Sequence, residues 1–421
     1  MKTRLPKALF VALLFCASHY ALAGTYTGTD GKNSFKYEAN VASYFTITKD
    51  TNQSTLTYSG TTGQISITGA TIDATDYQTF IANHAMDGYA LLIYNSKITA
   101  NDVVISGNAQ VHNKGVTQES GVTEISADNI SLEDQARIHA SSSNGYKVKL
   151  TAKENFTVTS TGTFQSAEVT AGSIEMKNSS YVNNSNFTAN NISLDNVAKR
   201  SGVINSNFKA EGGTISMKDS NVTISEGKSM LAAIIELESG SLTNAGTIEG
   251  ELQMSGGTFT MVDGAVAGAL TATSGTINIS GEVTFTGEVN LGADVVQFSA
   301  TGEGAPLTIN IEQGSTITME DVALNIASGV VFNVNLVDDA QLDAGEALFT
   351  IDYGSNDPSA VEEQLSQITT TLSYDGAVVE TYEPGSLQVG TDGSTSIVPE
   401  PATATLSLLA LASMAARRRR K

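Results

Sequence analysis

The 421-residue chain contains one cysteine, no tryptophan and only six prolines. Because Cys16 lies in an N-terminal stretch that we expect to be removed, the mature chain should form neither disulfides nor thiolate metal sites. Bases are scarce too, since 23 Lys and Arg stand against 44 Asp and Glu and give a net charge of −21. That balance argues against nucleic acid as a partner, because little would neutralise its phosphates.

The scarcity of bases is most pronounced in the second half. No Lys or Arg occurs between Ser229 and Ala416, whereas residues 229–398 carry 24 acidic groups. Ion pairing within this half is therefore impossible, and its cohesion should come from apolar burial and backbone hydrogen bonds. Such a surface is expected to stay solvated and to repel anionic lipid, and diffuse binding of divalent cations is an open alternative.

The N-terminal residues have the layout of a secretory signal peptide. Basic residues occupy positions 2, 4 and 7, an apolar run covers 8–17, and Ala21 and Ala23 precede Gly24. A basic start, an apolar core and an A-x-A site are typical of signal peptides. The sequence therefore predicts a leader over 1–23, cut by signal peptidase between Ala23 and Gly24.

The C-terminal residues are organised in three parts. Apolar or small residues at 402–416 separate a Pro-Glu-Pro triplet from a basic end. The triplet and the basic end consist of Pro399, Glu400, Pro401, Arg417, Arg418, Arg419, Arg420 and Lys421. The apolar stretch is shorter than the ~20 residues of a comfortable membrane span, but a cationic end favours insertion with that end in the cytoplasm.

This arrangement at 399–421 resembles the PEP-CTERM sorting signal of bacterial proteins that are processed by an exosortase. The resemblance implies export, transient anchoring in the inner membrane, cleavage near Pro399, and delivery to the envelope surface or the exterior. It also implies an association with extracellular polysaccharide or biofilm matrix. A plain anchor that stays in place is the alternative.

A short motif recurs through the middle of the chain: an apolar residue, a small or polar residue, alanine, a polar corner, and two further apolar residues at alternate positions. Its six copies begin at Ile98, Ile125, Leu150, Val169, Phe187 and Phe208. Apolar residues two apart face one side of a strand, and Asn, Asp and Gly in the corner tolerate left-handed backbone. A unit this short can bury its apolar edge only against neighbouring copies.

The sequence therefore predicts an all-β fold, a parallel β-helix or solenoid over 98–335 with apolar residues inside. Beyond Ser229 the strict motif fades, but alternation between glycine-containing bends continues. Residues 24–97 are expected to form an N-terminal β-region with a cap. Residues 336–390 should form a small β-rich closing module, followed by a linker at 391–398.

Two helices are expected. Thr75 to Gln78 has capping-box spacing, and Phe80, Ile81, His84 and Ala85 would share one helical face before Gly88, which predicts a helical N-terminal cap. The second helix should run from Asp357, as the N-cap, through Gln367, with proline at its first position.

Candidate metal ligands are few. His112 and His139 stand at the same position in successive motif copies, so in-register stacking would place them one coil apart. A two-histidine metal site, completed by Glu133 or Asp134, and a plain outward ladder are the two interpretations. The ladder is the better one, because no third ligand occupies a matched position. No resident cofactor is predicted.

Carboxylate pairs suggest a second class of function. Glu236 and Glu238, or Glu249 and Glu251, are spaced to share a strand face, as the two acids of a glycosidase would. Neither pair has a nearby base or tryptophan, and the motifs of common hydrolases and nucleotide-binding enzymes are absent. Thr-x-Thr pairs such as Thr258 and Thr260 are typical of ice-binding solenoids, but their spacing is irregular here.

We therefore expect a secreted, non-enzymatic structural or adhesive solenoid that contacts extracellular glycan or matrix. In fold and composition it is similar to the passenger regions of autotransporter-type proteins. An extracellular carbohydrate-active β-helix enzyme, either a polysaccharide lyase or a glycosidase, is the alternative.

Overall fold

The computed structural model describes residues 24–30, 33–39, 45–49, 53–58, 65–73, 79–84, 91–94, 96–113, 122–140, 148–159, 163–178, 181–197, 203–204, 206–291, 308–319, 324–326, 330–337, 347–353 and 357–397. The chain divides into two compact units. Unit 1 comprises Met1–Ala152 with Ser160–Gly162, and unit 2 comprises Lys153–Thr159 with Thr163–Lys421. Both consist of β-strands in their described parts, apart from one helix in unit 2, so the predicted all-β class is confirmed.

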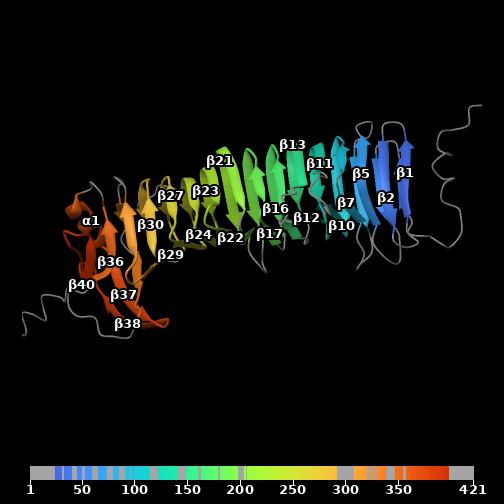
Figure 1. Cartoon of the computed structure of the whole chain (residues 1–421). Helices are drawn as coiled ribbons and strands as arrows, with labels where there is room; N and C mark the ends of the chain where they lie inside the picture. The colour runs from blue at the N-terminus through green and yellow to red at the C-terminus, as the bar shows by residue number, and fades with distance from the viewer. Residues whose placement is uncertain are drawn as a thin grey trace, which may run out of the picture. The chain divides into compact units, whose positions relative to one another are not determined.

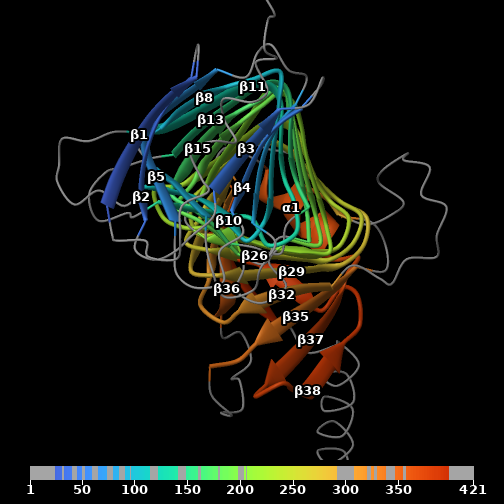
Figure 2. The ribbon, with the colours of Figure 1, turned by 90° about the vertical axis from the view of Figure 1, so that its right-hand side faces the viewer.

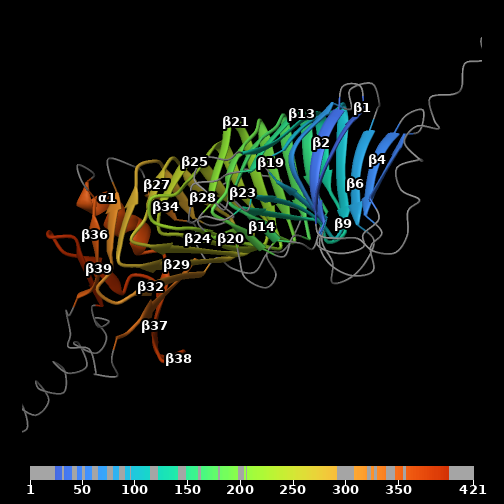
Figure 3. The ribbon, with the colours of Figure 1, turned by 45° about the vertical axis from the view of Figure 1, so that its right-hand side comes forward.

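Unit 1 begins with antiparallel strands, seen in blue in Figure 3. β1 (Gly24–Asp30) pairs with β2 (Asn33–Ala39), and β2 pairs on its other side with β5 (Ile65–Asp73). β3 (Phe45–Lys49) and β4 (Gln53–Tyr58) form a second antiparallel pair. Hairpins of this kind connect through short turns, whereas the strands that follow pair in parallel and need longer crossovers.

Parallel pairing in unit 1 starts from β4 and β5. One parallel row consists of β4, β6 (Thr79–His84), β9 (Asp102–Gly107) and β11 (Thr123–Leu132). A second row consists of β5, β7 (Leu91–Tyr94), β10 (Ala109–Asn113) and β12 (Arg137–Ala140). A third row consists of β5, β8 (Lys97–Thr99) and β11. Ile98 pairs with Ile125 and Val103 with Ile130, and all four side chains are buried. The distance in sequence between the first two copies of the motif, at Ile98 and Ile125, therefore corresponds to one coil, as predicted.

The helical cap predicted near the N-terminus is wrong over the residues that the structure describes. Thr79–His84 forms strand β6, in which Phe80 pairs with Ser54 on one side and Val103 on the other. Residues 74–78 and 85–90, with the rest of the predicted helix, lie outside the described residues. Ladders on both sides satisfy the backbone of β6, and this tertiary pairing outweighs the local capping-box signal.

Unit 2 is a parallel β-solenoid with three columns of strands, which we name after β16, β17 and β18. Figure 2 shows its strands lying behind one another along each column. The β16 column consists of the C-terminal part of β13 (Val148–Val158), β16 (Ser173–Lys177), β19 (Asn191–Asp195), the C-terminal parts of β21 (Asn207–Lys218), β23 (Ser229–Leu237) and β25 (Thr247–Met254), then β28 (Leu270–Ala272), β31 (Val289–Leu291) and β34 (Leu324–Ile326).

The other two columns repeat this arrangement. The β17 column consists of β14 (Thr163–Gln165), β17 (Tyr181–Asn183), β20 (Val203–Ile204), β22 (Ser220–Ile224), β24 (Gly240–Asn244), β26 (Thr258–Val262), β29 (Thr276–Ser280), β32 (Thr308–Glu312), β35 (Val331–Asn335) and β37 (Thr369–Tyr374). The β18 column consists of β15 (Ala167–Thr170), β18 (Asn186–Thr188), the N-terminal parts of β21, β23 and β25, then β27 (Ala265–Ala267), β30 (Glu282–Phe285), β33 (Thr316–Met319) and β36 (Ala347–Asp352).

The core of unit 2 lies between the columns. Inward residues alternate with outward ones along every strand, as in β26, where Phe259 and Met261 are buried and Thr260 is half-buried. Four buried phenylalanines pack in series across coils, with ring centroids 6.0, 5.4 and 5.2 Å apart, and they are Phe156, Phe164, Phe187 and Phe208. Phe187 and Phe208 are paired in register, so like side chains stack from one coil to the next at this position.

The alanine of the motif marks the corner between the β18 and β16 columns. Coil by coil, this corner is occupied by Ala171, Ala189, Ala210, Ala232, Gly250, Gly268 and Gly287. The alanines are buried. Where glycine takes over, the backbones approach more closely, since a Cβ on Gly250 would lie 1.9 Å from the carbonyl oxygen of Ala232.

The predicted use of left-handed backbone at the alanine corner is confirmed in some coils and not in others. Asn190 and Asn191, which follow Ala189, do not have positive φ. At the same corner Gly212 (φ 76°), which follows Ala210, and Gly250 (φ 128°) do have positive φ, and other corners use Asn184 (φ 47°) before β18 and Asn196 (φ 55°) after β19. Alanine followed by asparagine therefore turns this corner with ordinary backbone, whereas the coils with positive φ use glycine, which tolerates it.

The predicted C-terminal helix is confirmed as α1 (Pro358–Leu365). Asp357 is its N-cap and accepts a hydrogen bond from the backbone N–H of Ser359 at 3.0 Å. Gln364 Oε1 accepts from the backbone N–H of Ile326 in β34, at 2.8 Å, while Leu365 is fully buried. The helix thus covers β34 and satisfies part of its edge.

Antiparallel strands complete the other two columns at this end, drawn in red in Figure 1. β37 pairs with β38 (Ala377–Tyr382), and β36 pairs with β40 (Ser394–Ile397), which also pairs with β39 (Leu387–Val389). β36 and β37 are themselves parallel to β33 and β35, so the parallel ladder continues past residue 335 into the predicted closing module.

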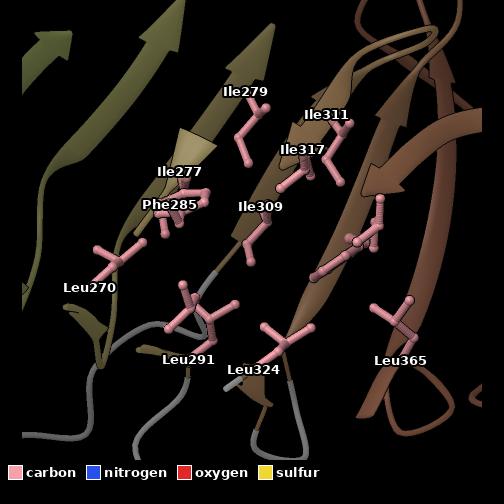
Figure 4. A pocket seen from close by; sticks show the side chains of 13 residues that line it. Leu270, Ile277, Ile279, Phe285, Leu291, Ile309, Ile311, Ile317, Leu324 and Leu365 are labelled. Carbon is pink, nitrogen blue, oxygen red and sulfur yellow. The ribbon is translucent and has the colours of Figure 1, made fainter. Parts of the chain in front are cut away.

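The interior near this end holds a cavity of about 50 Å³ with an entirely apolar lining. Figure 4 shows side chains from several strands, such as Leu270, Ile309 and Leu324, together with Leu365 of α1, pointing into it. Sites for small molecules typically have volumes of about 300–1,000 Å³, so this space belongs to the core and not to a ligand.

We expect Gly250→Ala to destabilise the protein more than Gly314→Ala. Both glycines have positive φ, but a Cβ on Gly314 would meet nothing within 4 Å, while one on Gly250 would collide with the Ala232 backbone. The left-handed conformation alone costs about 1–2 kcal/mol. Urea denaturation of the two variants measures the difference, and equal losses of unfolding free energy would show that the corner is not tightly packed.

Candidate functional site

The outward side of the β17 column carries a continuous set of hydroxyl and amide side chains, here called the Thr/Asn face. It consists of Thr258, Thr260, Thr276, Asn278, Thr308, Asn310, Asn333, Asn335, Thr371 and Ser373. These residues alternate with buried apolar ones such as Ile277 and Ile309, so the strand period places them on the outer side of the column, where all but the buried Ser373 are at least partly exposed.

Amides form a hydrogen-bonded row across four coils of this face. Asn278 Nδ2 donates to Thr260 Oγ1 at 3.0 Å, and Asn278 Oδ1 accepts from Asn310 Nδ2 at 2.7 Å. Asn310 Oδ1 in turn accepts from Asn333 Nδ2 at 3.0 Å. The row fixes the orientation of each amide, and Asn333 Oδ1 is buried without a partner in the part of the chain that the structure describes.

A groove of about 470 Å³ lies beside this row. Its lining comes from β29, β32, β35 and the residues after β35: Asn278, Ile279, Ser280, Asn310, Glu312, Asn335, Leu336 and Val337. The volume falls within the range of about 300–1,000 Å³ typical of ligand sites. Its lining combines polar and apolar surface in equal parts, and Glu312 is its charged group.

Two apolar residues of the lining, Leu336 and Val337, are held in place from both sides, and the third, Ile279, is buried in β29. The backbone N–H of Leu336 donates to the carbonyl of Ser373 at 2.8 Å, in the following coil. The backbone N–H of Val337 donates to Gln313 Oε1 at 3.0 Å, in the preceding coil. Val337 is nevertheless 69% exposed, so it presents its methyl groups to solvent.

The two candidate histidines do stand in register. His112 in β10 pairs with His139 in β12 across neighbouring parallel strands of unit 1. His84, expected on a helix, lies in β6 and pairs with Tyr58 and Gly107. No group of three metal-ligating side chains occurs among the residues that the structure describes. The sequence also clusters Asp338, Asp339 and Asp343, whose carboxylates are of the kind that binds calcium, but these residues lie outside the described part of the chain.

The carboxylate pairs proposed for an enzyme are arranged differently from each other. Glu249 and Glu251 lie on either side of the Gly250 corner and belong to different columns, so they do not share a face. Glu236 and Glu238 are both exposed at the end of β23, and Glu238 pairs with Lys218 at 2.7 Å. The Gly250 corner therefore separates Glu249 from Glu251, and Glu238 of the other pair is engaged in an ion pair with Lys218.

Shifted pKa values in the described residues arise from local surface contacts. The hydrogen bond to Glu238, and its charge, raise the pKa of Lys218. Hydrogen bonds from Ser359 and Ser394 lower the pKa values of Asp357 and Asp392. Burial, together with Glu380, raises the pKa of Tyr382 to about 12. These pairs stabilise turns and a helix cap, whereas a general acid or base is usually tuned inside a cleft.

Sequence reasoning missed the amides of the groove. A signal was present, because the sequence Thr-Ile-Asn-Ile occurs at 276–279 and again at 308–311, and Phe-Asn-Val-Asn follows at 332–335. The repeat spacing of 32 residues hid it, because residues 281–307, which include β30 and β31, lie between the two strands in sequence although β29 and β32 pair directly in space.

The fold and this face define a parallel β-solenoid with a polar outer surface. Comparison with family models identifies the PEP-CTERM protein-sorting motif at residues 398–421. The chain thus carries a PEP-CTERM sorting signal, which implies export and processing by an exosortase for the cell envelope or surface. The motif covers the predicted sorting residues Pro399, Glu400, Pro401 and Arg417 to Arg420.

The other comparisons and the ends of the chain add little. No curated protein and no solved structure matches the chain. The sorting residues, and Ala21 and Ala23 of the predicted signal peptide, lie outside the described residues, whereas Gly24 begins β1. In the parts of the chain that the structure covers, no helix has the length and apolarity needed to span a membrane.

We expect salt to stabilise the protein, because residues 229–398 combine 24 acids with no base. Raising NaCl from 10 to 150 mM shortens the Debye length from about 30 Å to about 8 Å and weakens repulsion between exposed carboxylates. The thermal midpoint should rise by a few degrees. Replacing the exposed Glu236, Glu249 and Glu282 together by Gln should reduce this rise. A midpoint that falls with salt would contradict the expectation.

Proposed function

We propose that this protein is a non-enzymatic structural or adhesive component of the cell surface that contacts extracellular polysaccharide or matrix. The observation that carries the proposal is the combination of an exosortase sorting motif with a solenoid that presents the Thr/Asn face. The likeness to autotransporter passengers in fold and composition supports the same role, without a defined ligand.

Repetition favours a polymeric partner. Successive coils stack at roughly 4.8 Å, so each column offers the same kind of side chain at regular intervals. Several weak contacts along one chain then act together, because each bound unit raises the effective concentration of the next. A solenoid can therefore hold a polymer without any deep pocket.

The carbohydrate-active enzyme is the weaker candidate. Retaining and inverting glycosidases need two carboxylates about 5–9.5 Å apart across one sugar. The groove beside the Thr/Asn face has Glu312 as its single carboxylate, and Glu249 and Glu251 lie in different columns.

A glycan and matrix-protein array tests the proposal. The 24–398 fragment should bind at least one polysaccharide or matrix protein and leave every polysaccharide of a broad panel intact, as judged by size-exclusion chromatography after incubation. Detectable hydrolysis or elimination would favour the enzyme instead. Failure to bind any array component would remove the adhesive role.

Processing makes a separate prediction. The protein recovered from envelope or medium fractions should lack Arg417–Lys421, because the exosortase cleaves near Pro399. Intact-mass spectrometry measures this directly, with whole-cell membranes from a strain without exosortase activity as the control. A secreted form that retains the arginines would argue for a plain anchor.

A further inference from the structure

We propose that the groove beside the Thr/Asn face binds an uncharged polysaccharide, which lies across β29, β32 and β35. The inference rests on the proposed function, and it narrows the partner to one chemical class and one place on the solenoid. The groove is built from described residues of three neighbouring coils.

The amides supply matched donors and acceptors. A carboxamide has two N–H donors and two acceptor positions on its oxygen. The row uses one N–H and one acceptor position at each of Asn278 and Asn310. The second donor and acceptor of both side chains are then available to a ligand. Sugar hydroxyls donate and accept at the same atom, so they complement such a surface.

The row is also pre-organised. Each amide is held by its neighbours in the coil before and the coil after, so a ligand does not need to order them. Side chains that are already fixed lose little conformational entropy on binding, which otherwise costs about 0.5–1.5 kcal/mol per immobilised side chain. A shallow site can therefore bind a polymer with useful affinity.

Leu336 and Val337 provide the apolar contact. Sugar rings have C–H faces, which pack against aliphatic or aromatic side chains, and this chain contains no tryptophan. Val337 is 69% exposed, yet its backbone is fixed by Gln313 and that of Leu336 by Ser373. An exposed valine on an anchored segment, beside a row of amides, is suited to a ligand with both hydroxyls and C–H faces.

Charge selects against ionic polymers. No Lys or Arg occurs in residues 229–398, so uronic acid or sulfated polymers would meet only repulsion. A polycation would need carboxylates that repeat along the column. Glu312 is instead paired in register with Asn335, which carries an amide, and the inward-facing side chains of the same strand are apolar. Carboxylates therefore do not repeat along the column. With anionic and cationic polymers disfavoured, an uncharged polysaccharide is the class of ligand that fits the groove.

The test uses the processed protein purified from the envelope or medium. Isothermal titration is carried out with neutral hexasaccharides of glucose, mannose and galactose, and with polygalacturonate and chitosan oligomers as charged probes. At least one neutral hexasaccharide should bind. Asn310→Ala and Val337→Ser should each weaken that binding tenfold or more.

Asn221→Ala is the matched control. Asn221 is an exposed outward amide in the same column, and its Oδ1 accepts from Ser241 Oγ at 2.8 Å, but it lies outside the groove. Its substitution should leave binding unchanged. If Asn310→Ala disturbs folding, Val337→Ser still tests the site, because a side chain that is 69% exposed contributes little to the core.

Unchanged binding in both groove variants would overturn the proposed site. So would binding of the charged probes alone, since chitosan binding without neutral binding would point to a cationic polymer. A protein that binds matrix components on the array but no neutral hexasaccharide would overturn this inference and leave the proposed function standing. Failure on the array as a whole would instead remove the proposed function.

Discussion

The parallel backbone ladder between successive coils is the interaction on which the rest of the structure depends. It places residue on residue in register, so that Phe187 stacks on Phe208 inside while Asn278 bonds to Asn310 outside. One geometry therefore produces both the core and the surface row. A slip of one residue would exchange the two faces, because side chains alternate along a strand. Register is thus what links the sequence motif to the proposed binding surface.

The ladder also explains how so acidic a half can remain folded. Carboxylates such as Glu236 and Glu249 point outward, where water screens them, while each coil adds backbone hydrogen bonds and apolar burial that do not depend on charge. The last bases before this half still contribute locally, as in the pair of Lys218 with Glu238. Exposed pairs of this kind stabilise little, so cohesion must come from the ladder.

Much of the fold could be predicted from the sequence, because alternation and the alanine motif report directly on the pairing of neighbouring coils. The C-terminal helix could be predicted as well, since Asp357 and Pro358 act locally. The N-terminal helix could not be excluded, because the capping-box spacing at residues 75–78 is also local, whereas the strand at Phe80 is imposed by Ser54 and Val103 from other coils. The groove was missed for a similar reason, since Asn278 and Asn310 are 32 residues apart in sequence and become neighbours only through the pairing of β29 with β32.

The distribution of lysine and arginine has a consequence for the life of the protein outside the cell. Proteases that cut after basic residues have no cleavable bond between Lys228 and Arg417, whatever the conformation of the chain. Digestion by an enzyme of trypsin's specificity would trim the first half and leave the second as one continuous piece. The half that carries the Thr/Asn face is therefore also the half that such enzymes cannot shorten.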